Sequence, residues 1–487
     1  MPSYQFASKK QKTHIVITCI RQKDFADWLK AQDRHIRTIA DENGFEGREG
    51  QYLVIRSETA NANQIFMSLS KNAKYAEGSD LSAFIARRFS LKMLKTASFE
   101  IEPKGLSIEE LERLSIGWAL EHYRFDTYKK AKDEKKPLLL LNKKIDQTRI
   151  KAVLDSTFLV RTLVNIPAND MGPDDLEKSA RELTTTHKAK ISVIRDKDLL
   201  TKNFPMVFAV GKGSTRRPRL IDITWGDAKK PKVTIVGKGV CFDTGGLDLK
   251  PSKGMLIMKK DMGGAAHALA AANMIMTLKL PIRLRVLIPA VENSVSGESF
   301  RPMDILKSRK GITVEIGNTD AEGRLILADA LTYACEGKDK PDLLIDLATL
   351  TGAARTALGA ELPALFSNRD NTLEEVRKLS MTNEVDDPVW PLPLWESYRK
   401  ELKTENADIS STGIGLAGAI NAALFLKEFV DPSVEWIHLD IYAWEPYGRA
   451  GRPKGGADTG LRTLCSLIEQ RYGNKKPAKK TARKKKS

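Results

Sequence analysis

Two glycine-punctuated segments of the chain, residues 236–261 and 318–325, concentrate lysine and carboxylate side chains. Several carboxylates that converge on one pocket repel one another unless cations hold them, so a site for two divalent metal ions is the economical explanation. The set is rich in oxygen ligands and contains no histidine. The candidate metal ligands are Lys238, Asp243, Asp261, Asp320 and Glu322.

Each of these residues alone has a simpler explanation. A single Asp beside a glycine is more often a turn former, and a single lysine is more often a surface residue. Together, inside otherwise apolar and glycine-rich segments, they are hard to explain structurally. Asp320 and Glu322 are two residues apart, which in extended backbone points both side chains the same way. Gly323 then allows a tight turn.

The elements around these segments predict a site at the edge of an open α/β sheet. The β-branched run 232–236 predicts a buried strand, and the small apolar residues 262–280 and 325–335 predict helices. Such sheets build their sites at the carboxyl ends of the strands, where a strand is followed by a polar glycine loop and a helix. Further strands are predicted over residues 190–194, 206–210, 220–225, 283–289, 342–348 and 435–442. This alternation predicts a mixed, mainly parallel sheet covered by helices on both faces.

The chain is long enough for two domains. We expect an α/β fold with a small N-terminal α/β domain over residues 1–155 and a larger catalytic domain over residues 156–472. In the first domain, helices are predicted over residues 25–39 and 108–128 and strands over 14–20, 52–55 and 96–101. This domain holds no histidine, cysteine or carboxylate cluster typical of a site.

Composition favours a soluble, cytoplasmic protein. Hydrophobic residues make up 41% and charged residues 29% of the chain, values usual for globular proteins. No apolar run is long enough to span a bilayer, and the first residues lack the apolar core of a signal peptide. The four cysteines form no C-x-x-C pair, which fits a reducing compartment.

The formal net charge is +17, and residues 473–487 contain eight Lys and Arg residues and no acid. This lysine-rich segment cannot bury a core and is expected to be a disordered tail. Non-specific binding of nucleic acid through the tail is therefore one alternative function. A second alternative is a two-metal hydrolase of phosphate esters, whose sites look similar in sequence.

The two segments resemble those of the leucyl aminopeptidase family, the cytosolic two-metal exopeptidases. The octapeptide Asn318-Thr-Asp-Ala-Glu-Gly-Arg-Leu325 matches the signature of that family without a change. Within residues 237–265, four parts match the family in residue type and spacing: Gly-Lys-Gly, Phe-Asp-Thr-Gly-Gly, the single Lys250, and Lys-Asp-Met-Gly-Gly-Ala. Further agreement lies in Asn-Ile-Pro-Ala-Asn (165–169), Ala-Thr-Leu-Thr-Gly-Ala (348–353) and His-Leu-Asp-Ile (438–441).

The resemblance implies a role for each candidate residue. Asp243 and Glu322 would be shared by both metals, Lys238 and Asp261 would complete one site, and Asp320 the other. Lys238 would ligate as a neutral amine and so needs a depressed pKa. Lys250 would polarise the scissile carbonyl, and Arg324 would hold a bicarbonate ion that serves as general base.

The resemblance also implies that a metal-bridging water hydrolyses the first peptide bond of peptide substrates, and that their free α-amine ligates one metal. The metals would be Zn or Mn, and the assembly a homo-hexamer. The pocket for the first side chain would be lined by Met258, Asn318, Thr349, Leu350 and Gly352.

Overall fold

The computed structural model describes residues 4–55, 64–129 and 136–473. They form two compact units, both α/β as predicted. The first comprises the described residues up to Pro167 together with 381–386 and 442–458, and the second comprises the rest. The boundary expected after residue 155 falls inside helix α6 (Gln147–Asn165). Apart from residue 473, the basic C-terminal segment lies outside the described residues.

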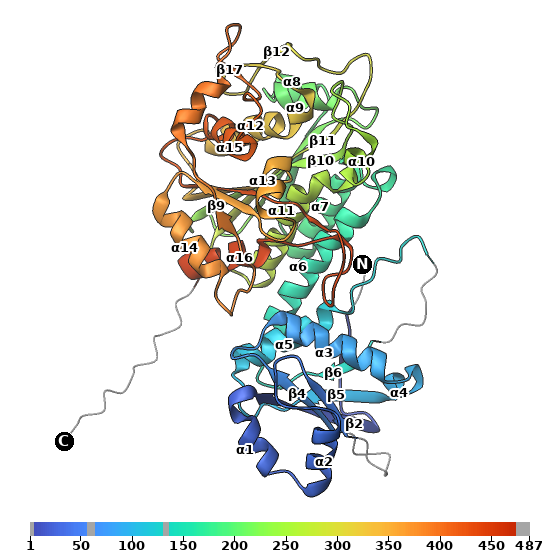
Figure 1. Ribbon diagram of the computed structural model, residues 1–487. Coiled ribbons are helices and arrows are strands. Elements are labelled where there is room, and N and C mark those ends of the chain that lie inside the picture. Colours follow the sequence, from blue (N-terminus) through green and yellow to red (C-terminus); the bar gives the residue numbers. More distant parts are fainter. Residues whose placement is uncertain (1–3, 56–63, 130–135, 474–487) are drawn as a thin grey trace, which may run out of the picture. The chain divides into compact units, whose positions relative to one another are not determined.

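The first unit contains a six-stranded sheet in the order β1-β6-β5-β2-β4-β3, coloured blue to cyan in Figure 1. All neighbouring strands are parallel except β3, which runs antiparallel to β4. The strands are β1 (Phe6–Ala7), β2 (Thr13–Arg21), β3 (Tyr52–Ile55), β4 (Gln64–Leu69), β5 (Ala97–Ile101) and β6 (Leu138–Leu140).

The helices of the first unit differ from prediction in two places. The helix predicted over 25–39 is divided into two, because the Asp33 side chain accepts a hydrogen bond from the Ile36 N–H at 2.8 Å and starts a new helix. The helix predicted over 108–128 ends at Leu120. The helices are α1 (Phe25–Lys30), α2 (Arg34–Glu42), α3 (Tyr75–Arg88), α4 (Leu91–Thr96) and α5 (Ile108–Leu120).

The second unit contains a larger sheet in the order β16-β15-β18-β14-β9-β11-β8-β7, with β10 paired to β11. The central strands β18, β14, β9 and β11 are parallel, and antiparallel pairs occur toward the edges, so the predicted mixed, mainly parallel sheet is confirmed. Its strands are β7 (Lys190–Arg195), β8 (Arg219–Trp225), β9 (Lys232–Gly237), β10 (Gly239–Asp243), β11 (Arg283–Asn293), β14 (Leu343–Ala348), β15 (Ala364–Ser367), β16 (Trp390–Pro391) and β18 (Trp436–Asp440).

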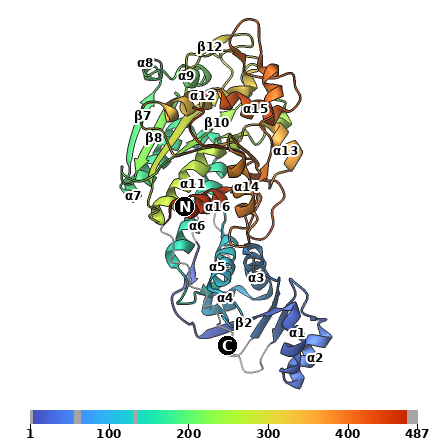
Figure 2. The ribbon, with the colours of Figure 1, turned by 90° about the vertical axis from the view of Figure 1, so that its left-hand side faces the viewer.

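Helices cover both faces of this sheet, as Figures 1 and 2 show. One face carries α7 (Pro173–His187), α11 (Gly263–Thr277) and α16 (Leu461–Tyr472), with α11 packed on β9 and β14. The other carries α9 (Pro205–Gly211), α12 (Glu322–Cys335) and α15 (Gly418–Lys427). Because α11 and α12 are both covered on all sides, nearly all of their residues are buried. Further helices and strands of this unit are α8 (Asp198–Thr201), α10 (Ser252–Met255), α13 (Gly352–Leu358), α14 (Asp370–Ser380), β12 (Ile305–Lys307), β13 (Thr313–Glu315) and β17 (Ile409–Ser410). The short strands β19 (Trp444–Glu445) and β20 (Gly455–Gly456) belong to the first unit.

The strand predicted over residues 206–210 is wrong, because this run forms the helix α9. Pro205 occupies its first turn, and the buried Asp329 carboxylate accepts hydrogen bonds from the N–H groups of Met206 and Val207 at 2.8 and 3.3 Å. A carboxylate at a helix N-terminus satisfies N–H groups that have no partner within the helix. A five-residue apolar run carries no periodicity that distinguishes a strand from a helix.

The parallel strands bring the candidate site residues to one edge. Lys238 follows β9, Asp243 ends β10 and Thr349 follows β14. Asp243 was expected in a loop, but its segment extends the sheet by pairing with β11. Among the described residues, none of the helices combines the length and hydrophobicity needed to span a lipid bilayer.

Candidate metal centre

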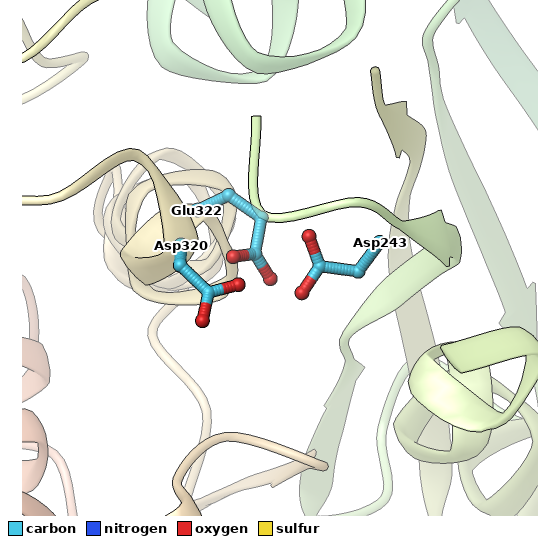
Figure 3. Close-up of side chains that lie close together, drawn as sticks. All are labelled: Asp243, Asp320 and Glu322. Atoms are coloured by element: carbon cyan, nitrogen blue, oxygen red, sulfur yellow. The ribbon is translucent and has the colours of Figure 1, made fainter. Parts of the chain in front are cut away.

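Three of the five candidate ligands meet directly. Asp243 ends β10, Asp320 lies in a 3-10 turn, and Glu322 is the first residue of α12. One oxygen of each carboxylate lies within 4.8 Å of the others, and Figure 3 shows the three groups facing one another. Burial, followed by the charge of Asp243, raises the pKa of Glu322 to about 8 and the pKa of Asp320 to about 6. Cations relieve repulsion of this kind.

The backbone at Asp320 and Glu322 is not extended, as their spacing had suggested. Thr319–Ala321 forms the 3-10 turn, and Glu322 has the helical backbone angles φ −65° and ψ −35°. The turn is stabilised because the Asn318 side-chain oxygen accepts a hydrogen bond from the Asp320 N–H at 2.7 Å. The two carboxylates therefore converge through a helical turn.

Lys238 connects the fourth carboxylate, Asp261, to this cluster. Its Nζ lies 2.8 Å from Asp261 Oδ2 and 2.8 Å from Glu322 Oε1, and donates a hydrogen bond to the Thr349 carbonyl at 2.9 Å. Burial acts to lower the pKa of Lys238, but the charges of Asp261 and Glu322 outweigh burial and raise that pKa. The neutral amine that the resemblance implies for Lys238 would therefore depend on the positive charge of a bound metal.

Gly323 allows this approach of Lys238. A Cβ added at Gly323 would lie 2.6 Å from Lys238 Cε, closer than unbonded carbon atoms come. Gly323 lies inside α12, so the tight turn expected there is absent. Its role in the fold is to leave space for the lysine side chain.

Lys250 contacts the other two carboxylates of the cluster, Asp243 and Asp320. Its Nζ is 2.8 Å from Asp243 Oδ2 and also contacts Asp320 Oδ1. Burial acts to lower the pKa of Lys250, but Asp243 and Glu322 outweigh it and raise that pKa, so the side chain is cationic at neutral pH. The loop that carries Lys250 is fixed by Asp248, whose Oδ2 accepts a hydrogen bond from the Thr319 N–H at 2.7 Å.

Asn293 contacts the cluster and was not among the residues predicted from the sequence. Its Nδ2 donates hydrogen bonds to Asp243 Oδ1 at 2.8 Å and to the Thr319 carbonyl at 3.1 Å. On the other side of the cluster, Thr349 Oγ1 donates to Asp261 Oδ1 at 2.8 Å. Asn293 ends β11, so its place beside β10 follows from the strand pairing, which the sequence alone does not give.

Arg324 presents a buried guanidinium with an unused donor. Its Nη1 donates to the Ser411 carbonyl at 2.6 Å, and its Nε is buried without a hydrogen bond among the described residues. Burial lowers the pKa of Arg324 to about 10, which still leaves it cationic at neutral pH. A group of this kind is suited to binding an anion.

The predicted pocket residues lie on the segments that carry the cluster. Asn318 is an exposed residue that fixes Asp320, and Thr349 contacts both Lys238 and Asp261. Leu350 is held through its N–H by Asp440 Oδ1 at 3.0 Å. Met258 begins the turn that carries Asp261, and Gly352 begins α13.

Known proteins share this arrangement of domains. The sequence model described as "Cytosol aminopeptidase family, catalytic domain" matches residues 158–465. The chain belongs to this family. A second model, "M17 aminopeptidase, N-terminal domain", matches residues 15–141. The resemblance noted in the sequence is thereby confirmed.

Individual relatives extend the likeness over most of the chain. A probable cytosol aminopeptidase of Syntrophotalea carbinolica is 39% identical over 454 residues, covering 88% of this chain and 90% of the relative. One from Aquifex aeolicus is 35% identical, covering 92% of each chain. The crystal structure of a cytosol aminopeptidase from Coxiella burnetii has a TM-score of 0.87 at 42% identity, covering 96% of this chain and 99% of that one. The bottromycin maturation enzyme BotP, solved in complex with Mn, has a TM-score of 0.82 at 30% identity, covering 94% and 99%.

Membership of the cytosol aminopeptidase family makes this protein a metal-dependent exopeptidase, a hydrolase that acts on peptides. The residues of the cluster fit divalent metals. Glu322 Oε2 is buried and has no hydrogen bond among the described residues, which would be costly without a cation. Carboxylate oxygens with one amine and no histidine form a donor set suited to hard or borderline divalent ions.

Proposed function

We propose that Lys238, Asp243, Asp261, Asp320 and Glu322 hold two divalent cations. The observation that carries this proposal is the convergence of buried carboxylates on the Lys238 amine, with Glu322 Oε2 left without a hydrogen bond in the part of the chain that the structure describes. By the resemblance to the family, Asp243 and Glu322 would be shared by both ions. The proposed ions are Zn or Mn, and Mn is supported by its presence in the complex of BotP.

When bound, the two cations would supply Lewis-acid chemistry, lowering the pKa of water and polarising the scissile carbonyl. Lys250 is cationic and lies beside Asp243, so its ammonium is placed to stabilise the oxyanion that develops on that carbonyl. Thr349 and Asn293 hold the carboxylates of Asp261 and Asp243 in place through short hydrogen bonds.

Arg324 supplies the place for bicarbonate as general base. No described residue forms a hydrogen bond with its buried Nε. Its helix α12 begins two residues earlier at Glu322, which brings the anion site beside the cluster. An anion there would also lie near free N–H groups of the helix start. Met258, Asn318, Thr349, Leu350 and Gly352 form the pocket for the first side chain of the substrate.

The metal centre also explains why only N-terminal residues would be removed. The free α-amine of the substrate is the group that the cationic centre would hold, and this contact positions the first carbonyl. Comparison of leucine arylamide with its N-acetylated form tests this idea. Turnover of the free substrate alone is expected, and comparable turnover of both would refute it.

The partners and location follow the family resemblance. A homo-hexamer in the cytoplasm is the proposed state, to be tested by sedimentation velocity. The eight cations of residues 473–487 favour non-specific binding of nucleic acid as a second function. Truncation after Tyr472 should then weaken DNA binding uniformly across sequences while peptidase activity is retained.

A further inference from the structure

A cavity of about 800 Å³ lies in the first unit, remote in sequence from the metal centre. Its walls come from the ends of β2 and β4, from the start of α5, and from the segment 381–386 that belongs to this unit. Arg21 and Leu69, the last residues of β2 and β4, are paired in register, so the cavity lies at the carboxyl edge of parallel strands.

The sheet topology marks this edge as a place for a ligand. From β2 the chain continues to β3 and β4 on one side, and then crosses to β5 on the other side of β2. Such a reversal of strand order opens a crevice outside the carboxyl ends of the strands, where open α/β sheets bind small molecules. The volume falls within the range of small-molecule sites and exceeds the need of a single ion.

Arg113 supplies a buried cationic group in this cavity. It is a lining residue on α5 and is only 5% exposed. Its Nε donates to the Ala73 carbonyl at 2.7 Å, and within the described residues its two terminal NH₂ groups have no hydrogen bond or ion pair. A planar guanidinium with two free donor groups matches the geometry of a carboxylate or phosphate.

The other buried charges of the cavity are already compensated. Arg21 lies 2.7 Å from Glu110 Oε1 and donates to the Ser70 carbonyl at 2.8 Å. Glu110 also accepts hydrogen bonds from the N–H groups of Ala73 and Ser107, so it satisfies the start of α5. These groups need no ligand, which leaves Arg113 as the buried lining charge that lacks a counter-ion within the described residues.

The other residues that line the cavity indicate the polarity of the rest of the ligand. Lys23 and Lys71 add exposed positive charge, and Glu49 and Glu384 add negative charge. Apart from Leu69, every lining residue is polar or charged, and side-chain amides such as Gln22 and Asn72 offer both donors and acceptors. Such a wall suits a ligand covered with hydroxyl groups and offers no aromatic surface for stacking.

We propose that the N-terminal unit binds a small polyhydroxylated molecule carrying an oxyanion, of the sugar phosphate class, with its phosphate on Arg113. Lys23 and Lys71 lie at the entrance and attract the anion. This site would be independent of the peptidase chemistry.

Isothermal titration calorimetry of the full-length protein tests this site. The probes are ribose 5-phosphate, inorganic phosphate, ribose and galacturonate, the last distinguishing a carboxylate from a phosphate ligand. Arg113→Gln keeps a donor for the Ala73 carbonyl and removes the charge. Lys71→Ala removes a rim charge, and Lys104→Ala, at an exposed lysine outside the cavity, is its matched control.

Ribose 5-phosphate is expected to bind more tightly than inorganic phosphate, ribose or galacturonate. Arg113→Gln should weaken this binding about tenfold or more, as loss of charge-assisted hydrogen bonds does. Lys71→Ala should weaken the binding of ribose 5-phosphate more than Lys104→Ala does. If Arg113→Gln does not fold, this comparison tests whether the cavity is the binding site. The proposal is overturned if ribose 5-phosphate does not bind, if inorganic phosphate binds equally well, or if Arg113→Gln and Lys71→Ala both bind like wild type.

Discussion

Asp243 and Asn293 are paired in register at the ends of β10 and β11, and Asn293 Nδ2 donates a hydrogen bond to Asp243 Oδ1 at 2.8 Å. The same amide also holds the Thr319 carbonyl, next to Asp320. One neutral side chain thus holds the Asp243 carboxylate directly and the backbone beside a second carboxylate, Asp320. Groups that orient metal ligands in this way contribute to affinity and activity without touching the metal.

Asn293→Ala should therefore lower metal affinity or kcat/KM by about 10- to 100-fold. Titration of the metal-free protein with metal, with activity as the readout, measures both metal affinity and kcat/KM. Asn406→Ala is the control, because Asn406 makes a similar contact to Glu315 Oε2 at 2.9 Å outside the cluster. Equal losses in the two variants would mean that Asn293 has only a general structural role.

Gly323→Ala should destabilise the protein and impair metal binding. An added Cβ would lie 2.6 Å from Lys238 Cε, so the lysine must leave its position between Asp261 and Glu322. Overpacking of this kind costs about 1–3 kcal/mol, whereas an unobstructed helical Gly→Ala exchange stabilises by about 0.5–1 kcal/mol. Gly254→Ala, where the nearest atom is 3.9 Å away, is the control for thermal unfolding. A stabilised Gly323→Ala variant would contradict the role of Gly323 in leaving space for Lys238.

Lys250→Ala should reduce kcat by about two to three orders of magnitude, as removal of one oxyanion donor does. Metal content should stay close to that of wild type, since Lys250 acts on the carbonyl. Lys253→Ala, at an exposed lysine on α10, should leave kcat unchanged. If Lys250→Ala purifies without metal, Lys250 is a ligand or a folding residue instead.

The lowered pKa of Glu177 predicts that the stability of the second unit depends on pH. Burial acts to raise its pKa, but hydrogen bonds from Arg195, Arg181 and Arg219 outweigh burial and lower the pKa from 4.5 to about 2. Because the folded pKa is depressed, the stabilisation is present above pH 4.5 and is lost as pH falls toward 2.

Glu177→Gln should lower the free energy of unfolding at pH 7 by roughly 1–3 kcal/mol, the range for charged hydrogen bonds. It should also flatten the dependence of that free energy on pH between 4.5 and 2. Denaturant unfolding at several pH values checks both effects. Glu182→Gln, exposed on the same helix, is the control, and an unchanged slope in Glu177→Gln would refute the assignment.

The sequence predicted the fold class and the identity of the clustered residues because both depend on short-range patterns. The β-branched run of β9 and the small apolar residues of α11 indicate a strand and a helix locally, and the glycine-rich segment between them carries the polar residues. Predictions failed where long-range contacts decide the structure. Residues 205–211 form a helix because Asp329, more than a hundred residues away, caps its N–H groups.

The same distinction applies to the site. Asp243, Asp320 and Glu322 could be identified from their local motifs, but the role of Gly323 could not, because it depends on where Lys238 passes. Asn293 has no motif of its own and acquires its role through pairing of β10 with β11. The return of residues 381–386 and 442–458 to the first unit is likewise a tertiary feature.

We expect the cluster around Lys238 and Glu322 to hold two divalent metals on which catalysis depends. The most direct test of this expectation is metal analysis by mass spectrometry of purified wild type and Glu322→Gln, with aminopeptidase activity measured before and after chelation. Active wild type should contain two divalent ions per chain. Chelation should abolish activity, and added Mn²⁺ or Zn²⁺ should restore it. Glu322→Gln should lose both metal and activity. Full activity in the chelated enzyme or in Glu322→Gln would contradict this expectation.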